Sequence, residues 1–132
     1  MEAVTISHQL LAKAGSPLSF TSGEVIFRAG DPGDNMYVVR SGEVEIELNG
    51  KVIETVASGG FVIETVASGG FFGEMALIDG SPRVATCRAK TNCEVATINE
   101  KNFVLLVDEM PYFALFVMRT LVHRLRLMDQ RL

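Results

Sequence analysis

The sequence contains few of the residues on which disulfide and metal chemistry depend. Only two cysteines, Cys87 and Cys93, occur in 132 residues, and they do not form a CxxC pair. This pattern favours free thiols in a reducing cytoplasm over a disulfide framework. The two histidines, His8 and His123, lie near opposite ends of the chain. A cupin-type metalloenzyme needs clustered histidine and carboxylate ligands, so it is a remote alternative, and no metal or cofactor is expected.

Signals for membrane insertion and secretion are also missing. The longest apolar run, Tyr112–Met118, is far shorter than the ~20 residues of a bilayer helix. The N-terminus has neither a basic region nor a long apolar region, so no signal peptide is expected. No GxSxG motif occurs, and neither cysteine has a base beside it. We therefore expect a protein that is not an enzyme.

The charge is acidic and unevenly distributed. The formal net charge is −4. Residues 1–118 carry −7, and residues 119–132 carry +3, from four arginines against Asp129. A chain this acidic is a poor candidate for binding nucleic acid through counterion release. Its 48% apolar and 21% charged residues fit one globular domain over residues 1–132.

Turn signals recur about ten residues apart between residues 22 and 92, which is the spacing of an all-β barrel or roll. Val44–Leu48 alternates between apolar residues and glutamates, as a strand with one buried face does. Asn49-Gly50 then favours a type I′ turn, because both residues tolerate a positive φ. We predict that Val52–Val56 is the returning strand of this hairpin.

Two later segments, Val84–Ala89 and Glu94–Ile98, are predicted to form a second hairpin. The fold class that follows is mainly β with flanking α. We expect an all-β barrel or roll over about residues 20–98. Two C-terminal helices are expected over residues 99–132.

The hydrophobic period changes after Ile98. Asn99 is a good N-cap for a helix over Glu100–Glu109, and Met110-Pro111 ends that helix and starts a longer one. The longer helix is expected to reach the end of the chain. Its apolar residues repeat at spacings of 4 and 3, as in a coiled-coil seam: Ala114, Met118, Leu121, Leu125, Met128 and Leu132. The seam favours a partner helix, and hence a homodimer, over packing on the chain's own roll.

A ten-residue segment is repeated in tandem, because residues 52–61 and 62–71 both read VIETVASGGF. Two copies are too few for a solenoid. Ten is even, so the insertion keeps the inward and outward parity of a strand, and either copy can pair with Val44–Leu48. We interpret the repeat as a duplication without a role of its own. The alternatives are a register switch or a strand-exchanged dimer, and a disturbed packing of Phe71 and Phe72.

The segment Gly70–Thr86 contains the most informative chemistry. Gly73 allows a tight entry into a short helix that begins near Glu74. Free amides at a helix start favour an anion, and a Gly-Ser-Pro turn can bring the guanidinium of Arg83 to the same place. The carboxylate of Glu74 beside an anion is better explained as an acceptor for sugar hydroxyls. Phosphate donors and a hydroxyl acceptor together describe a site for a small nucleotide.

Phe71–Thr86 resembles the phosphate-binding cassette of the cyclic nucleotide-binding domain family. It contains the Phe-Gly-Glu-Met-Ala-Leu core at residues 72–77 and the Pro-Arg-x-Ala-Thr end at residues 82–86. The upstream run Gly23–Gly42 resembles the early strands of the same family. The resemblance covers about residues 20–125. It implies an antiparallel, jelly-roll-like β-roll (a double-stranded β-helix) with flanking helices that binds cyclic AMP or cyclic GMP.

The resemblance implies roles for individual residues. Glu74 would hold the ribose 2′-hydroxyl, and Arg83 would pair with the exocyclic oxygens of the cyclic phosphate. Further backbone amides of the phosphate cradle would come from Ala76, Val84 and Ala85, and the ribose side would be lined by Gly73 and Met75. Members that prefer cyclic GMP often have Thr after the arginine, whereas this chain has Val84, so the resemblance favours cyclic AMP. The group that caps the base would come from the last helix, with four candidates: Arg119, Arg124, Met128 and Asp129.

The favoured function is a cyclic nucleotide receptor whose helices beyond Asn99 close over the base when the ligand binds. One alternative is the effector domain of a catabolite activator-type transcription regulator that lacks its DNA-binding part. Another is a degenerate roll that keeps the motif and binds nothing, with Glu74 and Arg83 paired in a salt bridge. The expected partners are a cyclic nucleotide and a second copy of the chain, without nucleic acid or membrane.

Overall fold

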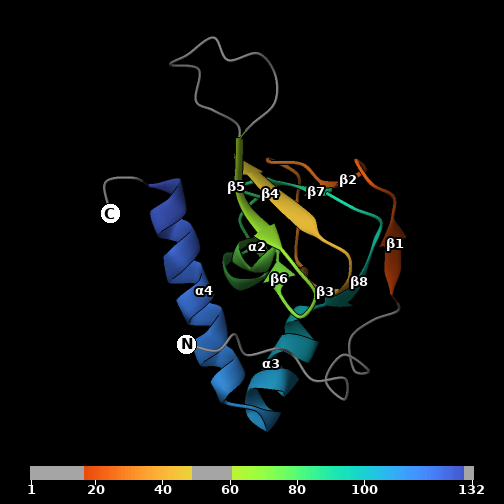
Figure 1. Ribbon diagram of the computed structural model, residues 1–132. Helices are drawn as coiled ribbons and strands as arrows, with labels where there is room; N and C mark the ends of the chain where they lie inside the picture. The colour runs from red at the N-terminus through yellow and green to blue at the C-terminus, as the bar shows by residue number, and fades with distance from the viewer. Residues whose placement is uncertain (1–16, 49–60, 130–132) are drawn as a thin grey trace.

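The computed structural model describes residues 17–48 and 61–129, which form an antiparallel β-roll with helices on one side (Figure 1). The strands form two four-stranded sheets, in the orders β1-β8-β3-β6 and β2-β7-β4-β5. This confirms the predicted fold class. The strands are β1 (Leu18–Phe20), β2 (Val25–Phe27), β3 (Met36–Ser41), β4 (Val44–Leu48), β5 (Phe61–Val66), β6 (Phe71–Phe72), β7 (Thr86–Ala89) and β8 (Cys93–Ile98), and the helices are α2 (Glu74–Asp79), α3 (Glu100–Glu109) and α4 (Tyr112–Met128).

The strand that returns along β4 comes from the second copy of the repeat. β4 itself has the predicted bounds, with Val44 and Ile46 buried. It pairs with β5 from Val44 opposite Val66 to Leu48 opposite Phe61. The predicted strand Val52–Val56 and the turn at Asn49-Gly50 lie outside the described residues. In the described part of the chain, copy two therefore occupies the place that we had predicted for copy one.

The predicted hairpin between Val84–Ala89 and Glu94–Ile98 is wrong. β7 pairs with β2 and β4, whereas β8 pairs with β1 and β3, so the two consecutive strands belong to different sheets. In a roll the chain crosses from sheet to sheet, and the turn at Thr91-Asn92 makes that crossing. The same turn residues serve a hairpin and a crossing, so local sequence does not separate the two.

Strand alternation divides the apolar residues between two cores. In β3, Val38 packs toward the helices and its neighbour Val39 packs inside the roll. In β6, Phe71 likewise belongs to the helix-side core and Phe72 to the roll interior. Both phenylalanines are fully buried, so the repeat upstream does not displace them. The period-2 geometry of a strand lets two adjacent apolar residues fill two separate cores.

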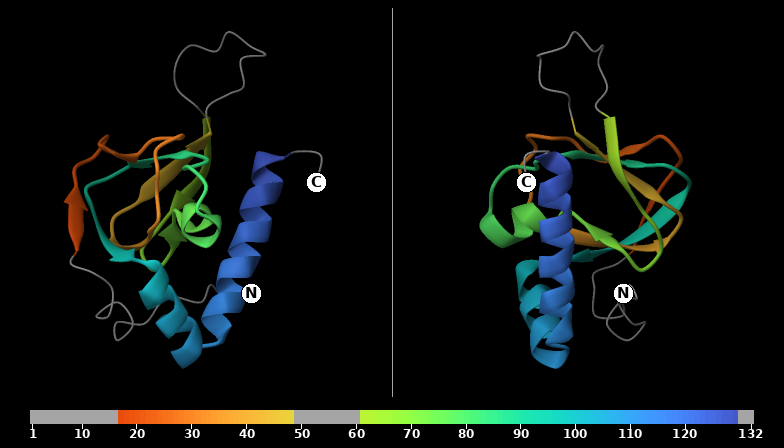
Figure 2. Two further views of the ribbon diagram at one scale, coloured as in Figure 1. Left: turned by 180° about the vertical axis from the view of Figure 1, so that it is seen from behind. Right: turned by 60° about the vertical axis from the view of Figure 1, so that its left-hand side comes forward.

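α3 begins and ends as the sequence predicts, and α4 begins directly after Pro111. α4 ends at Met128 with Asp129 as its C-cap, so the expectation that it reaches the end of the chain is wrong. The Asn99 side chain accepts a hydrogen bond from the Asn102 amide at 2.8 Å and caps α3. Met110 and Pro111 separate α3 from α4. Figure 2 shows the two helices diverging from this point, with α4 running up beside α2. Phe113 and Val117 anchor α4 in the helix-side core.

The predicted apolar seam does not lie on one face of α4. Leu121 packs on the helix-side core, whereas Met118 and Leu125 are exposed. Val122 joins these two on the solvent side, with exposed fractions of 53% for Met118, 49% for Val122 and 48% for Leu125. The seam is split because α4 uses part of it to cover its own roll. Leu132 lies outside the described residues.

The cysteines are free thiols, as the sequence predicts. Cys87 and Cys93 are both free and buried. Within residues 17–48 and 61–129, no helix is long and apolar enough to cross a membrane. The same residues contain no group of three or more histidine, cysteine, aspartate or glutamate side chains that could hold a metal ion.

Candidate functional site

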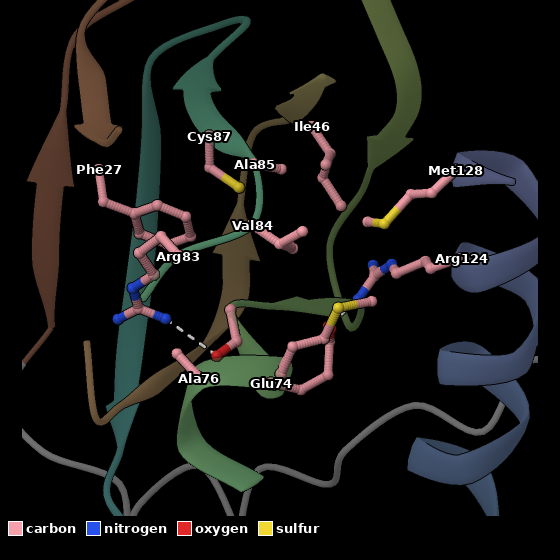
Figure 3. A pocket seen from close by; sticks show the side chains of 12 residues that line it. Phe27, Ile46, Glu74, Ala76, Arg83, Val84, Ala85, Cys87, Arg124 and Met128 are labelled. Carbon is pink, nitrogen blue, oxygen red and sulfur yellow. Dashed lines mark hydrogen bonds and ion pairs between the residues drawn. The ribbon is translucent and has the colours of Figure 1, made fainter. Parts of the chain in front are cut away.

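A pocket of about 340 Å³, counting its open mouth, lies between the roll, α2 and α4 (Figure 3). It contains all seven residues that the sequence singled out: Gly73, Glu74, Met75, Ala76, Arg83, Val84 and Ala85. Five further residues complete the lining: Phe27, Ile46, Cys87, Arg124 and Met128. Strand, cassette and C-terminal helix therefore meet at one cavity.

α2 begins where the sequence predicts, directly after Gly73. Gly73 has a left-handed backbone with φ of 79°, which non-glycine residues rarely adopt. A Cβ atom at this position would lie 2.8 Å from Nη1 of Arg83. A glycine is therefore required both by the turn into α2 and by the close approach of the guanidinium.

Arg83 is buried, with 6% of its surface exposed, and is held mainly by backbone. Its Nη1 donates to the carbonyl oxygens of Asn35 at 2.8 Å and Gly73 at 2.9 Å. Its Cζ lies 4.1 Å from the centre of the Phe27 ring, a cation–π contact. A second glycine, Gly33, leaves room for it, since a Cβ there would lie 2.1 Å from Nε.

The Nε of Arg83 has no hydrogen-bond partner although it is buried. A buried donor without a partner is unfavourable, and such groups are rare in native proteins. In the described residues no carboxylate forms an ion pair with Arg83, so the alternative salt bridge to Glu74 is not formed. The guanidinium at this wall of the pocket keeps its positive charge and a free N–H donor, which suits an anion with several oxygens.

Glu74 is also buried, at 3% exposure, and it binds a different arginine. Arg124 of α4 donates to it from Nη1, and donates from Nη2 to the Phe71 carbonyl oxygen at 2.6 Å. Arg124 also contacts Glu64 of β5, through Nε at 2.8 Å and Nη2 at 3.2 Å. A single guanidinium therefore joins α4 to β5, β6 and α2.

Burial sets the electrostatics of this side of the pocket. Loss of solvent raises the pKa of the Glu74 carboxyl, and the positive charge of Arg124 only partly opposes this. Burial alone would lower the pKa of Arg124. Hydrogen bonds to Glu64 and the charges of both carboxylates outweigh that effect, so its pKa is raised. Burial likewise raises the pKa of the Cys87 thiol, which favours its uncharged form.

The four candidates for a base cap do not all reach the pocket. Arg124 and Met128 line it, one helical turn apart on α4, whereas Arg119 and Asp129 are not among the lining residues. In Figure 3 the side chains of Arg124 and Met128 point from α4 toward α2 and β7. Ile46 and Cys87 form the apolar wall opposite them.

Sequence reasoning missed the residues that support the site from outside the cassette. Phe27 and Gly33 hold Arg83, and Glu64 holds Arg124. Gly33 is preceded by Pro32 in a plain turn signal, so nothing local indicates its second contact. Glu64 stands at a strand position whose side chain faces inward, where an apolar residue is expected. This charged residue among the apolar ones is the signal that could have identified it.

The fold is a β-roll with a pocket between its strands and its C-terminal helix, and comparison of the sequence with known families identifies which class of β-roll it is. The chain matches the cyclic nucleotide-binding domain family over residues 17–110, and it belongs to that family. The family is a regulatory, not a catalytic, one. This chain is also 40% identical over 97 residues to a cAMP-dependent protein kinase regulatory subunit of Emericella nidulans, and the match covers 74% of this chain and 22% of the relative. The chain thus spans about a fifth of the length of that curated relative.

Solved structures show the same fold. The catabolite activator protein of Thermus thermophilus superposes with a TM-score of 0.76 at 25% identity, covering 93% of this chain and 55% of that one. The cAMP-bound structure of PfPKA-R superposes with a TM-score of 0.71 at 25% identity, covering 87% of this chain and 36% of that one. The chain is therefore a cyclic nucleotide-binding domain that is similar to a kinase regulatory subunit and to a catabolite activator protein.

Proposed function

We propose that this chain is a cyclic AMP receptor module that binds the nucleotide in the pocket between the cassette and α4. One observation supports the proposal most strongly. Arg83 presents a buried guanidinium whose Nε has no partner, and Gly33 and Gly73 leave the space that this guanidinium occupies. A cyclic phosphate supplies one negative charge and acceptor oxygens that match these donors.

Each of the remaining cassette residues would contact a different part of the ligand. The backbone amides of Ala76, Val84 and Ala85 would complete the phosphate cradle, and Glu74 would accept a hydrogen bond from the ribose 2′-hydroxyl. Gly73 and Met75 would line the ribose side. The base would then face the end of the pocket lined by α4. Of the four candidates for its cap, Arg124 and Met128 are the two that line the pocket, which supports them over Arg119 and Asp129.

We assign cyclic AMP rather than cyclic GMP because of the residue that follows Arg83. Val84 lines the pocket and has no hydroxyl to donate to or accept from a guanine. Substitution Val84→Thr should therefore raise the affinity for cyclic GMP relative to cyclic AMP. A ratio of the two affinities that stays unchanged, measured by calorimetry, would contradict this assignment.

The first experiment is a thermal melt of the chain with cyclic AMP, cyclic GMP, 5′-AMP and no ligand. Ligand at 100 times its Kd should stabilise the fold by ~2.7 kcal/mol, a shift of several degrees for a domain of this size. We expect the largest shift with cyclic AMP and none with 5′-AMP. Absence of any shift would instead identify a degenerate roll that has kept its motif without binding.

We further propose that the ligand repositions the C-terminal helices. α4 reaches the pocket through Arg124 and Met128, so a ligand in the pocket contacts the helix and the cassette at once. It can shift the helix only by binding one position better than the other. Hydrogen exchange of residues 99–129 should slow when cyclic AMP binds. Identical exchange with and without ligand would refute this mechanism.

A homodimer through α4 is supported by the apolar stripe of Met118, Val122 and Leu125, which are about half exposed. Their spacing of 4 and 3 is that of a coiled-coil seam, so a second copy of the same helix is the occupant we propose. Val122→Glu should abolish self-association in sedimentation equilibrium. Val104→Glu is the matched control, because it introduces the same charge at an exposed valine of α3. A wild-type chain that stays monomeric at high concentration would exclude the dimer.

The effector domain of a transcription regulator is the second candidate. It is favoured by the likeness to a catabolite activator protein of which this chain covers 55%. The acidic net charge of −4 argues against DNA binding by these residues themselves. A gel shift at low salt with cyclic AMP present tests this, and we expect no retarded complex. The free thiols of Cys87 and Cys93 are consistent with our placing the module in the cytoplasm.

A further inference from the structure

Glu64 occupies an unusual position for an acidic side chain. On β5 the side chain of Val66 is buried and that of Thr65 is exposed, so Glu64, two residues before Val66, points inward with it. An inward strand position is normally apolar, because a charge there loses its water. The Glu64 side chain is 24% exposed and makes two hydrogen bonds to Arg124, at 2.8 and 3.2 Å.

The arginine that Glu64 binds is shared with the proposed ribose carboxylate. Arg124 is 2% exposed, and its Nη1 donates to Glu74 while Nε and Nη2 donate to Glu64. One guanidinium thus has two carboxylate partners that come from separate elements, β5 and α2. A buried guanidinium that loses its only carboxylate is strongly unfavourable, whereas one that loses one of two keeps its charge compensated.

We infer that Glu64 is a positioning residue that holds Arg124 and α4 against the pocket and so leaves Glu74 available for the ribose. This inference rests on the proposed function. When the 2′-hydroxyl donates to Glu74, the hydrogen bond from Arg124 to that carboxylate weakens, and Glu64 keeps Arg124 paired. Without Glu64 the only carboxylate left to Arg124 in the network is Glu74, so arginine and ribose compete for it.

The matched control comes from the repeat. Glu54 is the counterpart of Glu64 in the first copy, with the same seven residues after it and the same two before it. E54Q therefore removes the same charge from the same local sequence, and E64Q removes the carboxylate that contacts Arg124. The double variant E54Q/E64Q ensures that no glutamate of either copy can serve. E64D keeps the charge on a shorter side chain and provides a conservative rescue.

Cyclic AMP and 2′-deoxy cyclic AMP separate positioning from simple structural support. We expect E64Q and E54Q/E64Q to bind cyclic AMP about 10-fold more weakly than wild type, a loss within the usual range for coupled neighbours. E54Q should bind as wild type does, and E64D should recover part of the loss. The 2′-deoxy ligand has no hydroxyl to compete for Glu74, so its affinity should change less than 2-fold. An equal loss for both ligands, or no loss in E54Q/E64Q, would overturn the inference.

Exchange measurements without ligand keep this test independent of nucleotide binding. E64Q should speed the amide exchange of residues 112–128 relative to E54Q by about 10-fold, because one of the bonds that fix α4 is gone. If the wild-type chain binds no nucleotide, the proposed function fails and this comparison alone decides the role of Glu64 in holding α4. Equal exchange in E64Q and E54Q would then remove Glu64 from that role.

Discussion

The pocket has two buried arginines on opposite sides, and they are held in different ways. Arg83 rests on backbone carbonyl oxygens and the ring of Phe27, with no carboxylate among the described residues to neutralise it. Arg124 is bound by Glu64 and Glu74, so its charge is fully compensated. The difference shows that burial alone does not define a binding residue. The arginine without a counter-ion is the one suited to an external anion, and the compensated one connects parts of the fold.

The largest effect should come from removing Arg124, the arginine whose charge is balanced by Glu64 and Glu74. Arg124→Met leaves Glu64 and Glu74 without their cation, and removing one partner of a buried ion pair typically costs about 3–5 kcal/mol. We expect the free energy of unfolding to fall by that amount at neutral pH in a urea melt. Arg126→Met on the exposed face of the same helix is the control. A loss below about 1 kcal/mol would mean that Arg124 does not join the elements as described.

Arg83→Met should weaken ligand binding and leave the stability of the fold nearly unchanged, which is the reverse of the effect of Arg124→Met. Truncating a charged partner in a partly desolvated site costs about 2–5 kcal/mol of binding free energy, so cyclic AMP affinity should fall at least 30-fold. Stability without ligand should change little, because the substitution also removes a buried donor that has no partner. Calorimetry and urea melts on the same sample measure both quantities. Arg88→Met, which removes an arginine paired with Glu47, is the control and should not change affinity.

Deleting one copy of the repeat should have a smaller effect. Deletion of residues 52–61 or of residues 62–71 gives the same chain, in which Lys51 takes the place of Phe61 opposite Leu48. The strands would then be joined by Asn49-Gly50 alone, and the shorter connection should stabilise the fold by about 1–2 kcal/mol. Glu64 has an equivalent in the shortened chain, so cyclic AMP affinity should stay within 2-fold. A loss of binding would show that the repeat has a role of its own.

The smallest effect should be a pH dependence of the stability of the fold, caused by the carboxyl of Glu74. Burial raises the pKa of its carboxyl in the folded chain above the value in the unfolded chain, so the folded carboxyl holds its proton to a higher pH than the unfolded one. Its contribution to stability is therefore present below the unfolded pKa and is lost as the pH rises through the folded value. Relative to Glu74→Gln, the wild type should become less stable as the pH rises above about 4.5. A difference that grows in the opposite direction would mean that pairing with Arg124 outweighs burial.

Sequence reasoning succeeded where the deciding contacts are local. The N-cap at Asn99, the break at Met110-Pro111 and the short helix after Gly73 each depend on residues within a few positions of one another. The cassette residues meet in one pocket for the same reason, since one short helix and one turn carry them. Local physics singled out Gly73, Glu74 and Arg83, and the resemblance to the family supplied the other four cassette residues that line the pocket.

The failures concern contacts between distant segments. Sheet membership of β7 and β8 depends on the crossings of the roll, and turn residues do not encode it. Which copy of the repeat pairs with β4 is undetermined by sequence, because the copies are identical. The apolar residues of α4 were predicted to form one seam, because their spacing does not show that Leu121 packs on the helix-side core of the same chain. Arg124 and Glu64 are sixty positions apart, and only the folded chain brings them together.

Phe71 and Phe72 have a consequence for how this domain can evolve. The two adjacent rings fill separate cores. Phe71 packs edge-on against Phe116 of α4, and Phe72 stacks on Tyr37 within the roll. Phe72 also contacts Phe27, the ring that supports Arg83, and Phe71 lies beneath the guanidinium of Arg124. Selection on either half of the pocket therefore acts on the same two-residue strand. Neither half can drift alone, and substitutions there should appear in compensating pairs.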